Sequence, residues 1–165
     1  MTFIPNELIE LDRWVRHTQT KVPLSVRGYN ASSTKKHTWS SYERAINSTA
    51  GVGIGFMLNG DGIMCVDLDH CLVDGSPIPD VEQILSWIPP DTYVEVSPSG
   101  TGLHVWGTGA GLVNGRRFTV DGCAVEIYAD VRYITVTNRP FANSPSTLGN
   151  IQQLIDYLLL ETETE

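Results

Sequence analysis

The centre of the chain alternates apolar residues with glycine over Val52–Leu58, turns at Asn59–Gly62, and continues as a second apolar run over Ile63–Leu68. Alternation with a period of two predicts a strand, and Asn-Gly followed by Asp-Gly between two such runs is a strong signal for a hairpin turn. We therefore expect a hairpin of two antiparallel strands. This expectation limits the fold more than any other feature of the sequence.

Further strands and helices are expected on both sides of this centre. Strands joined by short turns and interrupted by helices are typical of an α+β domain built on a mostly antiparallel sheet. The expected strands are Trp14–Arg16, Lys21–Leu24, Tyr93–Val96, Leu103–Trp106 and the pair Val125–Tyr128 with Tyr133–Thr137, and the expected helices are Ile4–Leu11, Trp39–Ile46, Pro79–Ile88 and Ile151–Leu160.

Length and composition are those of one globular domain. The chain has 165 residues, of which 41% are hydrophobic and 18% charged. No apolar run approaches the roughly 20 residues that span a bilayer, and Met1–Glu10 lacks the features of a signal peptide, so we expect a cytoplasmic protein without a membrane partner. The three cysteines, Cys65, Cys71 and Cys123, form no C-x-x-C pair and are interpreted as buried small hydrophobic residues.

The net charge of -8 weighs against binding to nucleic acid. Proteins that hold nucleic acid through its phosphates usually have a basic surface. Bound divalent cations and the acidic end of the chain, Glu161–Glu165, would account for part of this charge. The remaining basic residues could still form a local groove.

The segment Val66-Asp67-Leu68-Asp69 places two carboxylates on one face of a strand. Residues i and i+2 of a strand point the same way, so Asp67 and Asp69 would project together about 6.6 Å apart along the strand. Adjacent carboxylates repel each other unless something neutralises them, and a divalent cation with oxygen ligands does so. Taken alone, this short pattern fits an exposed acidic strand end or a structural Ca²⁺ site better.

The segment from Ser97 to His104 combines hydroxyls and glycines before a strand with one histidine. Gly100 and Gly102 can adopt positive φ and let backbone N–H groups approach an anion, which would suit a triphosphate. Ser99 adds a hydroxyl, and His104 would face away from its apolar neighbours toward the same phosphates. The alternative is an ordinary Ser/Gly turn with a structurally satisfied histidine.

Glu126 is flanked by apolar residues in a predicted strand, and Arg132 follows six residues later. A glutamate on an otherwise buried strand needs a partner, and a metal shared with Asp67 and Asp69 would supply one. Arg132 could pair with phosphates. The alternative for Glu126 is a surface position on a half-exposed strand.

Together these segments contain what phosphoryl transfer requires: carboxylates for metal ions, a phosphate cradle and a cation for developing charge. Two Mg²⁺ or Mn²⁺ ions about 3.5–4 Å apart would activate a 3′-hydroxyl and stabilise the leaving pyrophosphate.

At these residues the sequence resembles the archaeo-eukaryotic primase superfamily, and most closely the phage and plasmid primase-polymerases. The family's ordered motifs are D-x-D/E, an S-x-G-x-x-H-like segment, a late acidic strand residue and R-Y-x-T-x-T-G. This chain has Asn138 in place of the last glycine. Upstream, the patterns W-V, K-x-P and A-S-S-T…W also match, so the resemblance covers residues 10 to 140. The matching segments are Val66–Asp69, Ser97–His104, Val125–Tyr128, Arg132–Thr137, Trp14-Val15, Lys21–Pro23, Ala31–Thr34 and Trp39.

The resemblance implies an RRM-like antiparallel catalytic sheet with a smaller α/β subdomain packed on it. It implies that Asp67, Asp69 and Glu126 hold two metal ions and act in catalysis with His104. Residues 1–150 would form the catalytic domain, and 151–165 a closing helix and acidic tail that could begin a linker to a further domain. By the same resemblance the incoming nucleotide would be held by Ser97, Ser99, Gly100, Gly102, His104 and Arg132, with Lys21 and Ser33 as further nucleotide or template contacts.

The implied activity is template-dependent nucleotide addition to a 3′-hydroxyl on single-stranded DNA, in phage or plasmid-type replication. The implied partners are template and primer, dNTP or NTP, and a fused or separate helicase. Because of the acidic charge, we expect weak template binding by this chain alone.

Three other hypotheses stay open. A metal-dependent nuclease or nicking replication initiator could use the same carboxylates, although a His-hydrophobe-His nicking enzyme would need a second histidine where Trp106 stands. A non-catalytic RRM-like module would bind single strands without metal, and a metal-bound structural domain would have no activity.

Overall fold

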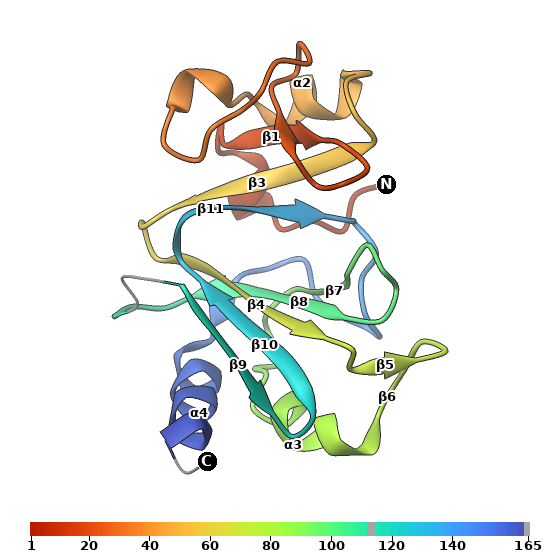
Figure 1. Cartoon of the computed structure of the whole chain (residues 1–165), viewed down its shortest axis with the longest axis vertical. Helices are drawn as coiled ribbons and strands as arrows, with labels where there is room; N and C mark the ends of the chain where they lie inside the picture. The colour runs from red at the N-terminus through yellow and green to blue at the C-terminus, as the bar shows by residue number, and fades with distance from the viewer. Residues whose placement is uncertain (112–114, 164–165) are drawn as a thin grey trace.

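The computed structural model describes residues 1–111 and 115–163, which form two large sheets, one above the other in Figure 1, and one small two-stranded sheet. The upper sheet, sheet A, has the strand order β11-β3-β1-β2 with every pair antiparallel. It consists of β1 (Trp14–His17), β2 (Pro23–Leu24), β3 (Gly53–Asn59) and β11 (Asp130–Val136), and it is accompanied by α1 (Asn6–Ile9), the 3-10 helix η1 (Lys36–Thr38) and α2 (Tyr42–Asn47).

The lower sheet, sheet B, has the order β12-β8-β4-β10-β9, and β7 also pairs with β8. Its pairs are antiparallel except that of β12 with β8, which is parallel. The α+β class with mostly antiparallel sheets is therefore confirmed. Sheet B and its attached elements are β4 (Ile63–Asp69), β7 (Val94–Val96), β8 (Leu103–Thr108), β9 (Arg116–Val120), β10 (Cys123–Tyr128), β12 (Gly149–Asn150), the small pair β5 (Leu72–Val73) and β6 (Ser76–Pro77), the 3-10 helix η2 (Pro79–Val81), α3 (Glu82–Leu85) and α4 (Gln152–Glu163).

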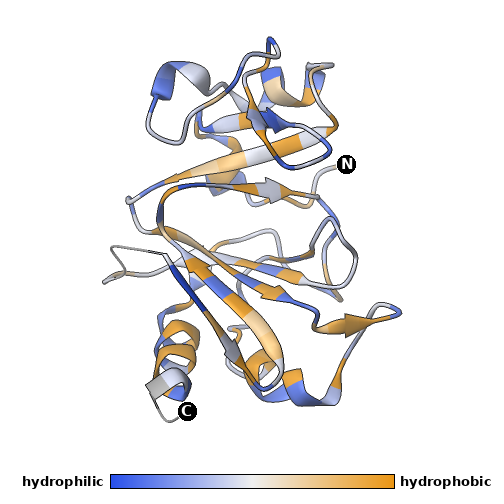
Figure 2. Ribbon diagram, in the orientation of Figure 1, coloured by the Kyte–Doolittle hydropathy of each residue, from blue (hydrophilic) through white to orange (hydrophobic). Residues whose placement is uncertain are grey.

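The structure has two apolar cores, one on the helix side of sheet B and one shared by the two sheets. One face of sheet B packs against α3 and α4, which carry apolar side chains (Figure 2), and this core includes Leu68, Val125 and Leu154. The other core contains residues of both sheets, such as Phe56 of β3 and Trp106 of β8; the Phe56 ring meets Trp14 and Trp106 edge-on at centroid distances of 5.1 and 5.9 Å. Because side chains alternate along a strand, burying Leu68 on the helix side turns its two aspartate neighbours to the opposite face.

The hairpin expected around Asn59–Gly62 is wrong. β3 pairs with strands of sheet A only, whereas β4 pairs with β8 and β10 in sheet B. The expected pairing of Val125–Tyr128 with Tyr133–Thr137 is wrong for the same reason, since β10 belongs to sheet B and β11 to sheet A. Instead, β3 continues into β4 and β10 continues into β11, and each of these two segments passes from one sheet into the other. The two segments run antiparallel to each other, and where they cross between the sheets the Gly60 N–H donates to the Ala129 carbonyl.

A buried arginine holds this crossing. Arg13 is 6% exposed, and its Nε donates to the Met57 carbonyl at 2.9 Å. Its Nη1 donates to Asn59 Oδ1 at 2.9 Å and to Asp61 Oδ2 at 2.5 Å. These bonds engage the residues that a tight turn would have used. A tertiary contact has therefore overridden the local turn signal.

Several element boundaries differ from the expected ones. The first helix is only Asn6–Ile9, and the stretch Pro79–Ile88 divides into η2 and α3. α2 begins at Tyr42 because the Ser41 hydroxyl accepts a hydrogen bond from the Arg44 N–H at 3.2 Å, as an N-cap does. The expected tail Glu161–Glu165 is helical as far as Glu163, and residues 164–165 lie outside the described residues. Strand β9 was not predicted from the sequence.

Cys65, Cys71 and Cys123 are free and buried, so their interpretation as small core residues is confirmed. Within residues 1–111 and 115–163, none of the helices combines the length and the apolar character that a membrane span requires.

The Arg13 contact predicts a measurable stability effect. Asp61→Ala would leave the buried guanidinium without its charged partner and should lower the free energy of unfolding by about 2 kcal/mol. Chemical denaturation would measure this. Glu82→Ala, at an exposed helix position, should change it by less than about 0.5 kcal/mol. An equal effect of the two substitutions would contradict the assigned role of Arg13.

Candidate active site

A row of five polar side chains crosses sheet B on the face away from the helices. The strand registers place Glu95 opposite His104, His104 opposite Asp67, Asp67 opposite Glu126, and Glu126 opposite Arg117. Residues directly opposite each other in antiparallel strands project on the same side and lie close together. The row therefore collects side chains from β7, β8, β4, β10 and β9, which are far apart in the sequence.

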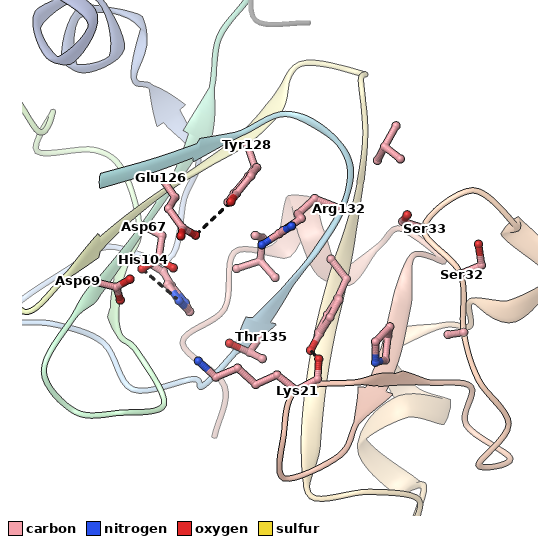
Figure 3. A pocket seen from close by; sticks show the side chains of 15 residues that line it. Lys21, Ser32, Ser33, Asp67, Asp69, His104, Glu126, Tyr128, Arg132 and Thr135 are labelled. Carbon is pink, nitrogen blue, oxygen red and sulfur yellow. Dashed lines mark hydrogen bonds and ion pairs between the residues drawn. The ribbon is translucent and has the colours of Figure 1, made fainter. Parts of the chain in front are cut away.

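Asp69 lies one step further along β4 on the same face and is half-buried. Together with Asp67, His104 and Glu126 it lines a cavity of about 660 Å³ between the two sheets, a size suited to a small ligand. Figure 3 shows these four side chains on one side of the cavity. The structure thus brings the three predicted metal carboxylates and the histidine to one place.

Sheet A supplies the opposite wall. Lys21, Ser33 and Arg132 line the cavity there, so three of the predicted nucleotide or template contacts share it with the acids. Lys21 has a φ of +66°, and its carbonyl accepts a hydrogen bond from the Tyr133 hydroxyl. The Arg132 guanidinium lies 4.3 Å from the centre of the Tyr128 ring. Both cations reach toward the acids in Figure 3.

The segment Ser97–Gly102 lies at the edge of this cavity and does not line it. Gly100 has the expected positive φ of +80°, but the expectation of a positive φ at Gly102 is wrong. A Cβ at Gly102 would lie 2.6 Å from the Leu68 carbonyl oxygen and 3.4 Å from Asp69 Oδ1. Glycine is needed there because the segment packs directly against the strand that carries the aspartates.

The hydroxyls of this segment bond to one another. Ser97 Oγ and Ser99 Oγ are 3.0 Å apart, as are Ser99 Oγ and Thr101 Oγ1. The Thr101 carbonyl accepts hydrogen bonds from the N–H groups of Cys71 and Leu72. The turn is therefore ordered beside Asp69, with its hydroxyls directed along its own length.

Asp67 is the least satisfied acid of the row. Its side chain is 19% exposed, and among the described residues its buried Oδ1 has no hydrogen-bond partner. His104 Nε2 is 3.9 Å away, beyond hydrogen-bonding distance. Burial is the main cause that raises the pKa of Asp67 to about 6; Asp69 and Glu126 raise it further, and His104 lowers it. A cation beside this carboxylate would satisfy an atom that the protein leaves without a partner.

Glu126 has partners of its own. It is 8% exposed, accepts a hydrogen bond from the Tyr128 hydroxyl at 3.1 Å, and pairs with Arg117 Nε at 3.1 Å. The Arg117 side chain is 77% exposed, so this ion pair is screened by water and easily exchanged. Among the described residues no three His, Cys, Asp or Glu side chains are grouped closely enough to hold a metal ion as they stand.

The donor set nevertheless fits a hard divalent cation. Asp67 offers an unpartnered carboxylate oxygen, and Asp69 and Glu126 offer carboxylates on the same face. Mg²⁺ in proteins is usually bound by one or two carboxylates together with substrate phosphates and water, so a closed protein cage is not required. Glu126 could join such a site by exchanging Arg117 for the ion.

Glu95 is a residue of this site that the sequence did not single out. It is fully buried and accepts hydrogen bonds from the Tyr93 hydroxyl at 2.9 Å, His104 Nδ1 at 3.0 Å, and the N–H groups of Thr137 at 3.0 Å and Asn138 at 3.3 Å. Four donors around one buried carboxylate fix its position. The only available signal was a glutamate between two valines in a predicted strand, the pattern that also marked Glu126.

Glu95 orients His104. With Nδ1–H donated to Glu95, the Nε2 atom faces Asp67 and the cavity. Burial lowers the pKa of His104, but the hydrogen bond and charge of Glu95, aided by Asp67, outweigh burial and raise it. The imidazole is thereby biased toward the charged form, which can donate from Nε2 to an anion.

Comparison with known proteins shows a similarity to a named phage protein. No family model matches the chain. The chain is similar to a protein named DNA primase-polymerase from Nitratiruptor phage NrS-1, with 34% identity over 140 residues that cover 78% of this chain. The matched part is 19% of the phage protein, so the chain spans about a fifth of that relative's length.

The raised pKa of Asp67 predicts a pH-dependent stability difference. A carboxyl that holds its proton more tightly in the folded state stabilises the fold when protonated, and this stabilisation is lost as pH rises from about 4 to 6. In EDTA at pH 7.5, Asp67→Asn should therefore unfold with a free energy about 1–3 kcal/mol higher than wild type. Below pH 4 the two proteins should be equally stable. A loss of stability at pH 7.5 would show that Asp67 is not a strained anion.

The Glu95–His104 bond predicts a spectroscopic change. In Glu95→Gln the imidazole loses its charged acceptor, so the pKa of His104 should fall. Titration of the imidazole ¹⁵N shifts by NMR would measure this. The signals of exposed His37 should be the same in both proteins and provide the control. An unchanged His104 titration would contradict the assigned role of Glu95.

Proposed function

We propose that this chain, a relative of a phage DNA primase-polymerase, is itself a primase-polymerase catalytic domain. It would add nucleotides to a 3′-hydroxyl on a single-stranded DNA template by phosphoryl transfer with two divalent metal ions. One observation carries the proposal: Asp67 and Glu126 are direct neighbours in register on one face, and this face lines a cavity whose other wall contains Lys21 and Arg132.

Asp67, Asp69 and Glu126 would hold Mg²⁺ or Mn²⁺. When bound, the ions would lower the pKa of the attacking hydroxyl and stabilise the charge of the leaving pyrophosphate. The protein would contribute position: Asp67 and Glu126 are fixed by the strand register, and the buried oxygen of Asp67 is already desolvated. The acids then need little reorganisation to bind the ions, except that Glu126 must exchange its ion pair with Arg117 for a metal ion.

The triphosphate would lie between the acids and the cations. Lys21 and Arg132 are exposed cations on the cavity wall, and His104 presents Nε2 from the sheet floor. Charge-assisted hydrogen bonds from such donors to phosphate are among the strongest that side chains make. The turn with Ser97, Ser99, Gly100 and Gly102 borders Asp69, so we assign it the outer end of the phosphate chain, and we assign Ser33 a contact to nucleotide or template.

The proposed setting follows the same similarity. We expect single-stranded template and primer, with dNTP or NTP, as the partners of this site, in phage or plasmid-type replication in the cytoplasm. Residues 1–150 would be the catalytic domain, with the RRM-like sheet of the archaeo-eukaryotic primases corresponding to sheet B. Because the match covers only 19% of the phage protein, we expect a helicase or priming domain to act with this chain, fused or separate.

Primer extension tests the proposal. With a primed template, Mg²⁺ or Mn²⁺ and dNTPs, wild type should extend the primer. Asp67→Asn, Asp69→Asn and Glu126→Gln should each lower the extension rate at least about a hundredfold, since each removes a proposed metal ligand. Asp74→Asn changes an exposed carboxylate that does not line the cavity and should leave the rate unchanged.

Two outcomes would favour other functions. Cleavage of the template without extension would indicate a metal-dependent nuclease or nicking enzyme. Oligonucleotide binding without any metal-dependent reaction, unchanged in the three variants, would indicate a non-catalytic binding module.

A further inference from the structure

Charge is distributed very unevenly along the chain. Residues 1–59 contain seven Lys and Arg against four Asp and Glu, whereas residues 60–165 contain four against fifteen. The first part includes three of the four strands of sheet A with its helices, and the second includes all of sheet B. The net charge of -8 therefore conceals a basic region beside a strongly acidic one. A local basic surface of this kind is what nucleic-acid phosphates recognise.

This basic region contains a second hollow, separate from the active cavity. Its volume is about 470 Å³. Arg27 and Arg44 are both exposed, and neither forms an ion pair with another described residue. A neighbouring hollow shares these two arginines and adds Glu43 as its acidic residue. The hollow is lined by Ser25, Val26, Arg27, Tyr29, Asn30, His37, Thr38, Trp39 and Arg44.

The same hollow presents aromatic rings. Tyr29 is 73% exposed, yet its backbone is held, because its N–H donates to Ser25 Oγ and its carbonyl accepts from the Ser25 N–H. Trp39 is half-buried, and its indole Nε1 donates to the Ser32 carbonyl at 2.7 Å. Aromatic rings presented by an ordered backbone beside cations form a platform on which unpaired bases stack, whatever their sequence.

One loop connects this hollow with the active cavity. Ala31, Ser32 and Ser33 line the active cavity, whereas His37, Thr38 and Trp39 line the hollow. Figure 3 shows Ser32 and Ser33 at the side of the cavity opposite the acids. Lys35 and Lys36 are exposed on the same loop. A polyanion lying in the hollow would therefore cross a basic loop to reach the acids of sheet B.

We propose that the surface formed by Arg27, Tyr29, Trp39 and Arg44 binds single-stranded DNA and guides the template to the active cavity. Here it is called the template surface. The inference rests on the proposed function, because the occupant is identified by the strand that such an enzyme must hold. Single-stranded rather than duplex DNA is expected, since stacking on Tyr29 requires unpaired bases.

Fluorescence anisotropy with a labelled mixed-sequence oligonucleotide tests this surface, in EDTA without nucleotide and over a series of NaCl concentrations. The double variant Arg27→Ala/Arg44→Ala should bind about tenfold more weakly. The slope of the logarithm of the binding constant against the logarithm of the salt concentration should become shallower by about 0.7 for each lost phosphate contact. Tyr29→Ala should weaken binding about five- to a hundredfold without changing the salt dependence, whereas Tyr29→Phe keeps the ring and should bind like wild type. Thermal melting would verify that each variant is folded.

Arg116→Ala is the matched control, because Arg116 is an exposed arginine that lines neither the hollow nor the active cavity. The inference is overturned if Arg116→Ala weakens binding as much as the double variant, or if duplex DNA or an acidic peptide displaces the oligonucleotide as well as single-stranded DNA does. It is also overturned if Tyr29→Ala binds like wild type.

The design separates this inference from the proposed function. Asp67→Asn should bind the oligonucleotide at least as tightly as wild type although it should not extend a primer. If wild type binds through the template surface but never extends a primer, the surface stands and the polymerase proposal fails. If wild type extends primers and the double variant does so with unchanged template dependence, the polymerase proposal stands and the surface fails.

Discussion

Three carboxylates held in one row of a sheet must each be compensated, and the structure compensates them unequally. Glu95 receives four hydrogen-bond donors, and Glu126 has Tyr128 and Arg117. Asp67 lies between His104 and Glu126 and has a buried oxygen without a partner among the described residues. Buried anions of this kind are costly unless something positive joins them. The chemistry proposed for the site follows from this unequal distribution.

The same constraint explains why the chain needs two sheets. Sheet B alone would present its acids to water, where a cation is weakly held and phosphates are repelled. The segments β3–β4 and β10–β11 each pass from one sheet into the other, so sheet A lies over the acid row. As a result, one continuous stretch carries Glu126 on the floor of the cavity and Arg132 on its wall. A cavity with carboxylates on one side and cations on the other suits a ligand made of phosphate and metal ions.

The sequence predicted what depends on local alternation. A period of two was enough to place Asp67 and Asp69 together and to turn Leu68 into the core. It could not place Glu126 beside Asp67, because the register of strands distant in sequence depends on the whole sheet, and there the family resemblance supplied the pairing. It missed Glu95, whose importance arises only from four donors on three segments. The sequence-based prediction of a hairpin at Asn59–Gly62 was wrong, because Arg13, more than forty residues away, forms hydrogen bonds with the side chains of Asn59 and Asp61.

Net charge is a poor guide to what a particular surface can bind, because charges act over short distances. At physiological ionic strength the Debye length is about 8 Å, so a phosphate responds mainly to the side chains nearest to it. Around Tyr29 these include Arg27 and Arg44, whereas around Asp67 they include the carboxylates of Asp69 and Glu126 beside His104. An acidic row repels a triphosphate until cations bind, whereas a basic surface attracts a nucleic-acid strand at once. If the proposed function holds, the template therefore binds the template surface first, and the nucleotide binds the acid-lined cavity only after metal ions have neutralised its carboxylates.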